Sequence, residues 1–258
     1  MACSGASSRL MLGFLAVLLG AALQGCATDH RAIGRQPDTI SDQVRDGAVL
    51  MKRMRGHPCC DRVAGTAGQQ ALARAAVGFL GKSRIEVNGR RFTFDCSGLA
   101  RAVYATQGID LYNGLGELDG GNGVGRIYGH VVRHGRIHYG PTVRPGDLVF
   151  FHNTWDFNRD EAFNDPLTHV GVVETVEPDG TVLFVSQVSG GIERYRMNLK
   201  TPDRHRANDG RVLNDYLRRK TFSDADGTQY LTGQLFAAFG TLVNEQPSPF
   251  SSHHAVWS

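Results

Sequence analysis

The sequence predicts an α+β fold in which N-terminal helices pack on an antiparallel sheet. Two early segments have apolar residues at three- and four-residue spacing, which is the period of an amphipathic helix. Three later segments are apolar and rich in β-branched and aromatic residues, and Pro178-Asp179-Gly180 separates the last two as a strong turn signal. Helices followed by a meander of strands are typical of the α+β class.

Two helices are expected before the strands. The first begins at Gln69 and ends at Gly81, and its apolar face is formed by Leu72, Ala75, Ala76, Phe79 and Leu80. The second begins beside Cys96 and ends at Gly108. Its apolar face is formed by Leu99, Ala102, Val103 and Thr106.

The strands are expected at residues 147–151, 169–176 and 182–186, and the last two form a hairpin. Residues 109–141 are rich in glycine, so we expect an irregular segment there. One further amphipathic helix is expected near the C-terminus. Its apolar residues are Tyr230, Leu231, Leu235, Phe236, Phe239 and Leu242.

Length and composition favour one sizeable globular domain with appendages. The chain has 258 residues and a mass of 28.1 kDa, and 41% of it is hydrophobic. A net charge of +3 is too small to indicate a nucleic-acid partner, and we expect none. We divide the chain into a signal peptide (1–25), a tether (26–65), the domain (66–200) and a C-terminal extension (201–258) that contains the last helix.

The N-terminus has the pattern of an export signal. Arg9 precedes the apolar stretch from Leu10 to Leu23, whose length of about 14 residues is too short to cross a bilayer. The stretch ends in Leu23-Gln24-Gly25-Cys26, which resembles the lipobox of bacterial lipoproteins. The resemblance implies cleavage before Cys26 and lipidation of its sulfur. Because Ala27 follows, it also implies outer-membrane sorting, hence a lipid-anchored protein of the cell envelope that faces the periplasm.

Cys96 and His169 are the candidate catalytic residues. Cys96 lies where a loop becomes a helix, and the N–H groups and dipole of a helix N-terminus favour a thiolate. The small residues Ser97 and Gly98 leave the sulfur accessible. His169 opens a strand and is the candidate base. Taken singly, Cys96 fits a buried core cysteine better than a nucleophile, and His169 fits a hydrogen-bonded histidine at a sheet edge better than a base.

Three sequence blocks together resemble the NlpC-type cell-wall cysteine peptidases, which are papain-like enzymes related to CHAP amidohydrolases. The blocks are Phe94-Asp-Cys-Ser-Gly-Leu99, Arg144-Pro-Gly-Asp-Leu-Val-Phe-Phe151 and His169-Val-Gly-Val-Val173. The resemblance covers about residues 70–200 and implies a papain-like domain without a cofactor. It also implies that Cys96 attacks an amide carbonyl of a peptidoglycan stem peptide with His169 as base.

In the family, a third polar residue on the next strand orients the histidine. Matching Phe184-Val185-Ser186 to the family pattern gives this role to Ser186, where a histidine is common. Gln187 is the alternative, and alternation along a strand points the two side chains to opposite faces. A neutral serine holds an imidazolium less strongly than a charged partner does, so activity is expected to be modest.

The segment before the nucleophile departs from the family pattern. Members often carry a tyrosine there that contributes to stem-peptide recognition, whereas residues 82–91 of this chain contain none. Arg90 and Arg91 offer positive charge to the carboxylates of a stem peptide. The pair Asn88-Gly89 favours a simpler interpretation, a solvated hairpin turn.

A calcium loop is considered between the second and third blocks. Asp156, Asn158 and Asp160 alternate as calcium ligands do, but Glu161 stands at the sixth position in place of glycine. Leu167 stands at the twelfth position in place of glutamate. A polar surface insertion is therefore the preferred interpretation, and no metal is assigned.

A zinc site and a redox lock are considered and set aside. His130, His134 and His138 recur every fourth residue, but interspersed glycines and arginines oppose a metal-binding helix. Cys59 and Cys60 form a vicinal pair in the tether, and a bridge from either to the candidate nucleophile would silence it.

The sequence therefore predicts a lipid-anchored cysteine hydrolase that cleaves peptide or amide bonds of peptidoglycan stem peptides. Two other functions stay open. One is a catalytically silent lipoprotein that binds the cell wall, and the other is a thiol-dependent acyl or amide transferase.

Overall fold

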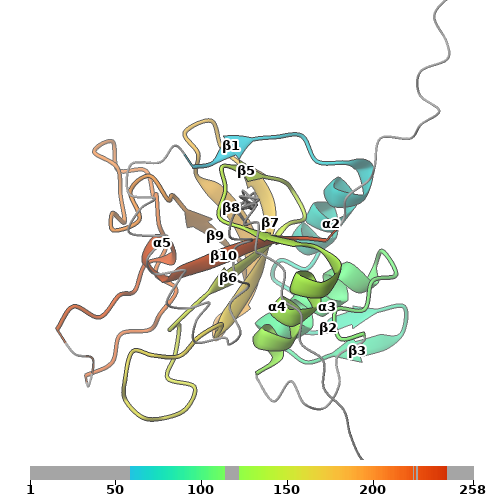
Figure 1. The fold of residues 1–258 in the computed structure, drawn as a ribbon, viewed down its shortest axis with the longest axis horizontal. Helices are drawn as coiled ribbons and strands as arrows, with labels where there is room; N and C mark the ends of the chain where they lie inside the picture. The colour runs from blue at the N-terminus through green and yellow to red at the C-terminus, as the bar shows by residue number, and fades with distance from the viewer. Residues whose placement is uncertain (1–58, 114–121, 223, 225, 243–258) are drawn as a thin grey trace, which may run out of the picture. The chain divides into compact units, whose positions relative to one another are not determined.

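A computed structural model describes residues 59–113, 122–222, 224 and 226–242 of the chain. Its centre is a six-stranded sheet with the order β4-β10-β6-β7-β8-β9, in which the paired strands run antiparallel (Figure 1). The strands are β4 (Arg136–His138), β6 (Leu148–Phe151), β7 (His169–Val176), β8 (Val182–Val188), β9 (Gly191–Met197) and β10 (Phe236–Thr241). Helices with an antiparallel sheet confirm the predicted α+β class.

The helices cover one face of this sheet. They are α2 (Ala67–Val77), α3 (Cys96–Ala105) and α4 (Gly123–His134), whereas α5 (Thr232–Leu235) is a single turn that leads into β10. α2 and α3 both pack on β7, and α4 packs on β10. α2 begins in a capping box, since Thr66 Oγ1 accepts from Gln69 N–H while Gln69 Oε1 accepts from Thr66 N–H.

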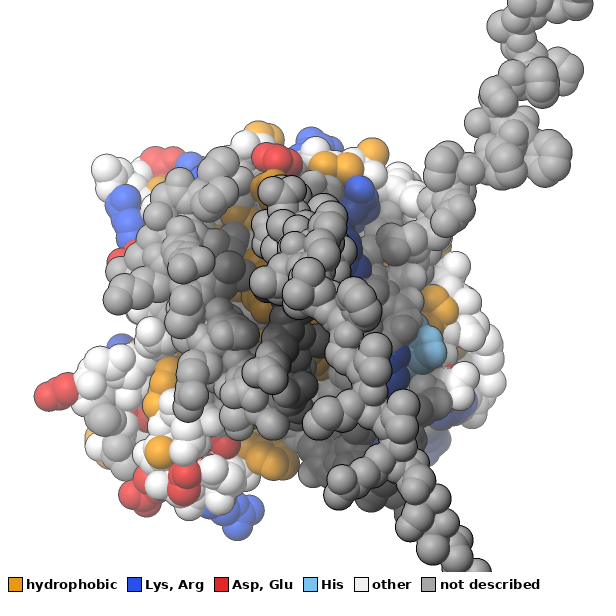
Figure 2. All heavy atoms as spheres, in the orientation of Figure 1, with side chains coloured by type: hydrophobic (Ala, Val, Ile, Leu, Met, Phe, Trp, Pro, Cys, Tyr) orange, Lys and Arg blue, Asp and Glu red, His pale blue; other side chains and the backbone are white. Residues whose placement is uncertain are grey.

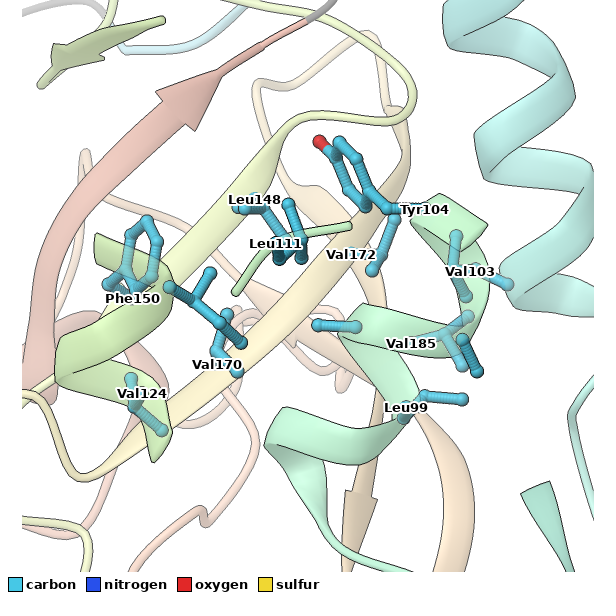
Figure 3. Packing of buried hydrophobic residues seen from close by; sticks show 14 of the residues in the cluster. Leu99, Val103, Tyr104, Leu111, Val124, Leu148, Phe150, Val170, Val172 and Val185 are labelled. Carbon is cyan, nitrogen blue, oxygen red and sulfur yellow. The ribbon is translucent and has the colours of Figure 1, made fainter. Parts of the chain in front are cut away.

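Two apolar clusters hold the layers together, one on each face of the sheet. On the helix side, Leu99 and Val103 of α3 face Val172 and Val185 of the central strands (Figure 3). The opposite cluster includes Phe184 of β8 together with residues from the N-terminal segment, α5 and β10. All five of the named side chains are buried, so β7 and β8 are held from both faces.

The predicted C-terminal amphipathic helix at 230–242 is wrong, because Phe236–Thr241 forms strand β10 and only Thr232–Leu235 is helical. All six residues of β10 are buried, and Phe239 lies opposite His138 of β4 and Val149 of β6. An internal strand covered on both faces has a continuous apolar run without alternation, which sequence periodicity does not separate from a helix. The sheet therefore includes part of the C-terminal extension and does not end at residue 200.

The segment 109–141, expected to be irregular, contains the twelve-residue helix α4. Asn122 caps it by accepting from Gly125 N–H through Oδ1. The helix ends at Gly135, where a Cβ atom would lie 2.3 Å from the carbonyl oxygen of Thr241. Its glycines weaken the intrinsic helical preference, but burial of one apolar face compensates. That buried face includes Val124, Ile127 and Val131.

The smaller strands form two separate pairs. β2 (Ile85–Val87) and β3 (Arg90–Phe92) make the hairpin that Asn88-Gly89 predicts, and both turn residues have positive φ angles, 51° and 77°. β1 (Asp61–Arg62) and β5 (Thr142–Val143) pair in parallel. The predicted hairpin turn at Asn88-Gly89 is thus confirmed.

The predicted signal peptide, Cys26 and the tether as far as residue 58 lie outside the described residues. Of the helices in the described ranges, none has the length and apolar character needed to cross a bilayer.

Candidate active site

Cys96 is the first residue of α3, and the residues around it fix its position. Asp95 caps the helix, because its Oδ1 accepts from the Gly98 N–H at 2.7 Å and from the Ser97 hydroxyl at 2.8 Å. Gly98 is required by close packing, since a Cβ atom there would lie 2.0 Å from the carbonyl oxygen of Thr93. The run Asp-Cys-Ser-Gly therefore places the thiol at the start of the helix.

The Cys96 thiol is held in its protonated form. Burial, and after it the neighbouring Asp95 carboxylate, raises its pKa from 9.0 to about 11. Main-chain N–H groups of Val170, Ser97 and Cys96 itself oppose this shift by favouring the thiolate. The donors that would stabilise negative charge on the sulfur are thus already in place, although the resting group is a thiol.

His169 begins β7, opposite Phe151 of β6, and its ring is hydrogen-bonded to β8. Its Nε2 lies 2.8 Å from Ser186 Oγ, and the Ser186 hydroxyl lies 2.7 Å from the Val170 carbonyl oxygen. A carbonyl only accepts, so the single hydroxyl proton of Ser186 goes to Val170. Ser186 then accepts from Nε2–H, and this network assigns Nδ1 as the unprotonated nitrogen of the ring.

The His169 imidazole is neutral at neutral pH, because burial lowers its pKa to about 4. Among the described residues, the thiol of Cys96 makes no hydrogen bond to this ring. Instead it faces the N–H of Val170, the residue that follows His169. The structure therefore places the thiol and the imidazole on packed elements, α3 and β7, as two neutral groups.

Of the two side chains considered for the third position, only Ser186 reaches the histidine. Gln187 turns away, and its Nε2 donates to the carbonyl oxygen of Val188 at 2.7 Å. Ser186 is fully buried, whereas Gln187 is half-buried. The alternation of side chains along β8 explains the difference.

An aromatic and basic cluster adjoins the start of α3, and the sequence did not reveal it. The Tyr112 ring contacts two guanidinium groups, that of Arg101 at 3.8 Å from the ring centroid and that of Arg126 at 4.1 Å. A Cβ atom on Gly123 would lie 2.6 Å from Tyr112 Oη and 2.7 Å from Ser97 Oγ, so this cluster abuts the start of α3. Two of the three residues, Tyr112 and Arg126, come from the segment 109–141 that was expected to be irregular.

A partly buried histidine, His152, fixes the segment before β7. His152 Nδ1 accepts from the Leu167 N–H at 3.0 Å, and burial lowers the pKa of His152 to about 4. Thr154 and Thr168 join the two ends of the same loop through their hydroxyl groups at 2.9 Å. These bonds set the backbone that leads into His169.

The three regularly spaced histidines lie on different elements. His130 and His134 are on α4 with ring centroids 4.5 Å apart, whereas His138 is on β4 and contacts Thr241 Oγ1 at 3.1 Å and Asp147 at 3.8 Å. Within the described ranges, no three or more His, Cys, Asp or Glu side chains form a group arranged to hold a metal.

The remaining cysteines and arginines that the sequence singled out lie elsewhere. Cys59 and Cys60 form a disulfide with each other and are buried on the side of the sheet opposite the helices, so Cys96 is a free thiol. Arg91 lies 3.6 Å from Glu86 across the β2–β3 hairpin, and Arg90 lies over the Phe92 ring.

Comparison with known families agrees with this geometry. The model of the NlpC/P60 family matches residues 81–203, a segment that includes Cys96, His169 and Ser186. No curated protein and no solved structure shows a significant match to the chain. NlpC/P60 domains are papain-like, and the family generally comprises cysteine peptidases and amidases that act on peptidoglycan. Residues 81–203 of this chain therefore belong to the NlpC/P60 family.

Proposed function

We propose that this protein hydrolyses peptide or amide bonds in peptidoglycan stem peptides, with Cys96 as nucleophile, His169 as general base and acid, and Ser186 as the residue that orients His169. The observation that carries the proposal is the hydrogen bond from His169 Nε2–H to Ser186. This bond leaves Nδ1 free to take a proton. His169 begins β7, and the Cys96 thiol faces the main chain of the next residue of that strand, Val170.

The first step forms a thioester. His169 Nδ1 accepts the thiol proton of Cys96 as the sulfur attacks the amide carbon, and the carbonyl oxygen becomes an oxyanion. N–H groups at the start of α3 stabilise that oxyanion, as a helix N-terminus does for negative charge. The amine then leaves with the proton from His169. Water, deprotonated by the same nitrogen, cleaves the thioester and restores the thiol.

Two features of the site determine how this step begins. Both groups are neutral at rest, so proton transfer accompanies attack and no ion pair precedes it. The thiol and the imidazole are not yet hydrogen-bonded, and catalytic contacts often tighten only when substrate is bound. Because Ser186 is neutral, it stabilises the imidazolium less than a carboxylate would. We therefore expect a modest turnover rate.

The chemistry around the nucleophile suits an anionic stem peptide. Arg101 and Arg126 provide two positive charges beside Tyr112, close to Ser97 and the start of α3. The Nε of Arg101 is buried and has no hydrogen-bond partner among the described residues. A substrate carboxylate is a suitable partner for such a guanidinium group.

We also propose that the protein is anchored to an envelope membrane by lipid on Cys26. This proposal rests on the apolar N-terminal stretch and the lipobox-like run that ends it. The test is fractionation of cells that express Cys26→Ser. The variant is expected in the soluble fraction, and a variant that stays with the membrane contradicts the lipid anchor.

Mass spectrometry of muropeptides released from purified sacculi tests the hydrolase proposal. The wild-type chain should release new fragments and identify the bond, whereas Cys96→Ala should release none. Gln107→Ala, at an exposed position just beyond the C-terminal end of α3, is the control and should match wild type. Binding to sacculi without release by wild type would indicate a silent wall-binding protein, and products that contain an added amine would indicate a transferase.

A further inference from the structure

The loop between β6 and β7, which leads into His169, is rich in acidic residues. It projects at the lower left of Figure 1, and acidic side chains are exposed at the same place in Figure 2. Residues 156–165 contain four carboxylates and a single basic residue, Arg159. The carboxylates are those of Asp156, Asp160, Glu161 and Asp165.

Two of these carboxylates each have one oxygen that is satisfied and one that is not. Asp156 Oδ2 accepts from the Glu161 N–H at 3.0 Å, and Asp165 Oδ1 accepts from the Asn158 N–H at 3.2 Å. The other oxygens, Asp156 Oδ1 and Asp165 Oδ2, are buried and have no hydrogen-bond partner. Within the described ranges, these are the two buried carboxylate oxygens without a partner.

The free oxygen of Asp165 is the more significant of the two, because the Asp165 side chain lies almost entirely inside the protein. The residue is only 3% exposed, and its bond to the Asn158 N–H directs the carboxylate into the segment that carries Asp156. A buried carboxylate normally has a compensating hydrogen bond or positive charge for each oxygen. A missing partner of opposite charge is the simplest account of this arrangement.

Arg218, which is bonded to the main chain of Asn153, does not supply that partner. Arg218 donates from Nη1 to the Asn153 carbonyl oxygen at 2.8 Å, and its Nη2 lies 3.5 Å from Asp224. Its guanidinium group also lies over the Phe163 ring at 5.3 Å. Neither contact reaches the free oxygen of Asp165.

We propose that residues 156–165 form a calcium site in which Asp156 Oδ1 and Asp165 Oδ2 are the anchoring ligands. Calcium takes six to eight oxygen ligands in flexible geometry, and main-chain, amide and water oxygens supply the others. Fewer than three carboxylates converge as a metal cluster, so these neutral oxygens are needed to complete the shell. Cysteine and histidine are absent from residues 156–165, so the donor set favours a hard cation.

The structure removes both sequence objections to a calcium loop. Glu161 takes the place of the usual sixth-position glycine but has a φ of 59°, the left-handed conformation for which glycine is normally required. Leu167 is not a ligand at the twelfth position, and the carboxylate of Asp165 reaches the loop from two residues earlier.

The site has a consequence for the strand that begins at His169. Asp165 is tied to Asn153 by two bonds, because its N–H donates to Asn153 Oδ1 and its carbonyl accepts from the Asn153 N–H. Thr168, adjacent to His169, is held by Thr154. A cation between Asp156 and Asp165 would join both ends of the loop, directly before β7.

Terbium luminescence of the purified full-length chain tests binding, because terbium substitutes for calcium and Trp155 precedes the first ligand. Excitation of Trp155, which is half-exposed, should produce terbium emission that added calcium reverses. Trp155→Phe should lose most of the emission while calorimetry still detects calcium. No calcium-reversible emission from the wild-type chain would overturn the proposal.

Charge-removing variants then locate the site. Asp156→Asn and Asp165→Asn each keep an oxygen for the N–H bond that the aspartate accepts but lose the charge, so calcium affinity should fall about tenfold or more. Asp203→Asn removes an exposed carboxylate in another loop and should bind within about twofold of wild type.

Thermal melts in a chelator check that the variants fold. Both Asn variants should melt at or above the wild-type temperature, because they remove an uncompensated charge, and calcium should then raise only the wild-type and Asp203→Asn melting temperatures. Equal calcium shifts in all four proteins would place the ion elsewhere and contradict the proposal. The readouts are independent of peptidoglycan hydrolysis, so the two proposals succeed or fail separately.

Discussion

Ser186 accepts the Nε2–H of His169 because its own hydroxyl proton is committed to the Val170 carbonyl oxygen. A neutral side chain thus fixes the tautomer of the imidazole through one additional bond to the main chain. The histidine is oriented by the register between β7 and β8, since both partners of Ser186 belong to the start of β7.

Ser186→Ala is expected to lower kcat/KM for muropeptide release by roughly ten- to a hundredfold, because the imidazole loses its orienting partner. The buried Nε2–H would also lose its acceptor, which costs about 1–3 kcal/mol of unfolding free energy. Steady-state kinetics and urea unfolding measure the two effects. The matched control is Gln187→Ala, which should change kcat/KM by less than about twofold; an equal loss in both variants would contradict the role of Ser186.

Protein stability should decrease in mild acid because of His169 and His152. Burial lowers the pKa of each from 6.5 to about 4, so the unfolded state binds protons below pH 6.5 that the native state refuses. Stability is therefore full above pH 6.5 and falls by about 3 kcal/mol per histidine as the pH drops to 4. Urea unfolding from pH 7 to 4 measures the slope. In His169→Gln, the number of protons taken up on unfolding, which the slope gives, should fall by about one. An unchanged slope would show that His169 titrates normally.

Alkylation of Cys96 by iodoacetamide should be slow at neutral pH and accelerate with pH. The pKa of the thiol is raised to about 11, and the thiolate fraction therefore grows about tenfold per pH unit below that value. Site-resolved mass spectrometry from pH 7 to 10 gives the rate for Cys96 alone. A rate that is independent of pH across this range would instead indicate a thiolate–imidazolium pair in the resting enzyme.

Gly98→Ala should destabilise the fold by about 1–3 kcal/mol or more, because the new Cβ atom would lie 2.0 Å from the Thr93 carbonyl oxygen. The control is Gly125→Ala in the first turn of α4, where the nearest atom would be 3.7 Å away. That change should be neutral or stabilising, by up to about 1 kcal/mol. Thermal unfolding compares the two, and equal melting temperatures would disprove the close contact.

A chain that ends at residue 203 should fail to fold, although it contains the whole family match. It lacks β10, which pairs with both β4 and β6, so Val149 and Phe150 would lose their covering layer. A chain that ends at residue 242 keeps β10 and should fold. Circular dichroism and hydrogen exchange distinguish the two truncations, and a cooperative melt of the shorter one would show that β10 is dispensable.

Strong local patterns predicted the parts of the fold that surround the nucleophile. α2, α3 and the β7–β8 hairpin have clear periodicity and turn signals, and the structure contains each of them near the expected residues. α4 was missed because its glycines obscure a buried face that only tertiary packing stabilises. β10 was misassigned because a strand buried on both sides does not alternate.

The candidate site likewise has residues that local sequence patterns indicate and contacts that depend on tertiary structure. Cys96 and His169 could be proposed from the sequence because each belongs to a contiguous sequence block, whereas the choice between Ser186 and Gln187 depends on the register of β8. The contacts of Arg101 and Arg126 with Tyr112 join α3, the loop after it and α4, and they depend on how the two helices pack. A single sequence contains no signal for such a contact.

The position of β10 also determines when the site can form during synthesis. In the sheet, β6 lies between β7 and β10. β10 comes from the last described segment of the chain. A polypeptide still emerging from the ribosome or crossing a membrane therefore has an incomplete sheet around His169, even after Cys96, His169 and Ser186 have all been made. We expect any chemistry of the candidate site to begin only after β10 is inserted, so that a partly made chain is inactive.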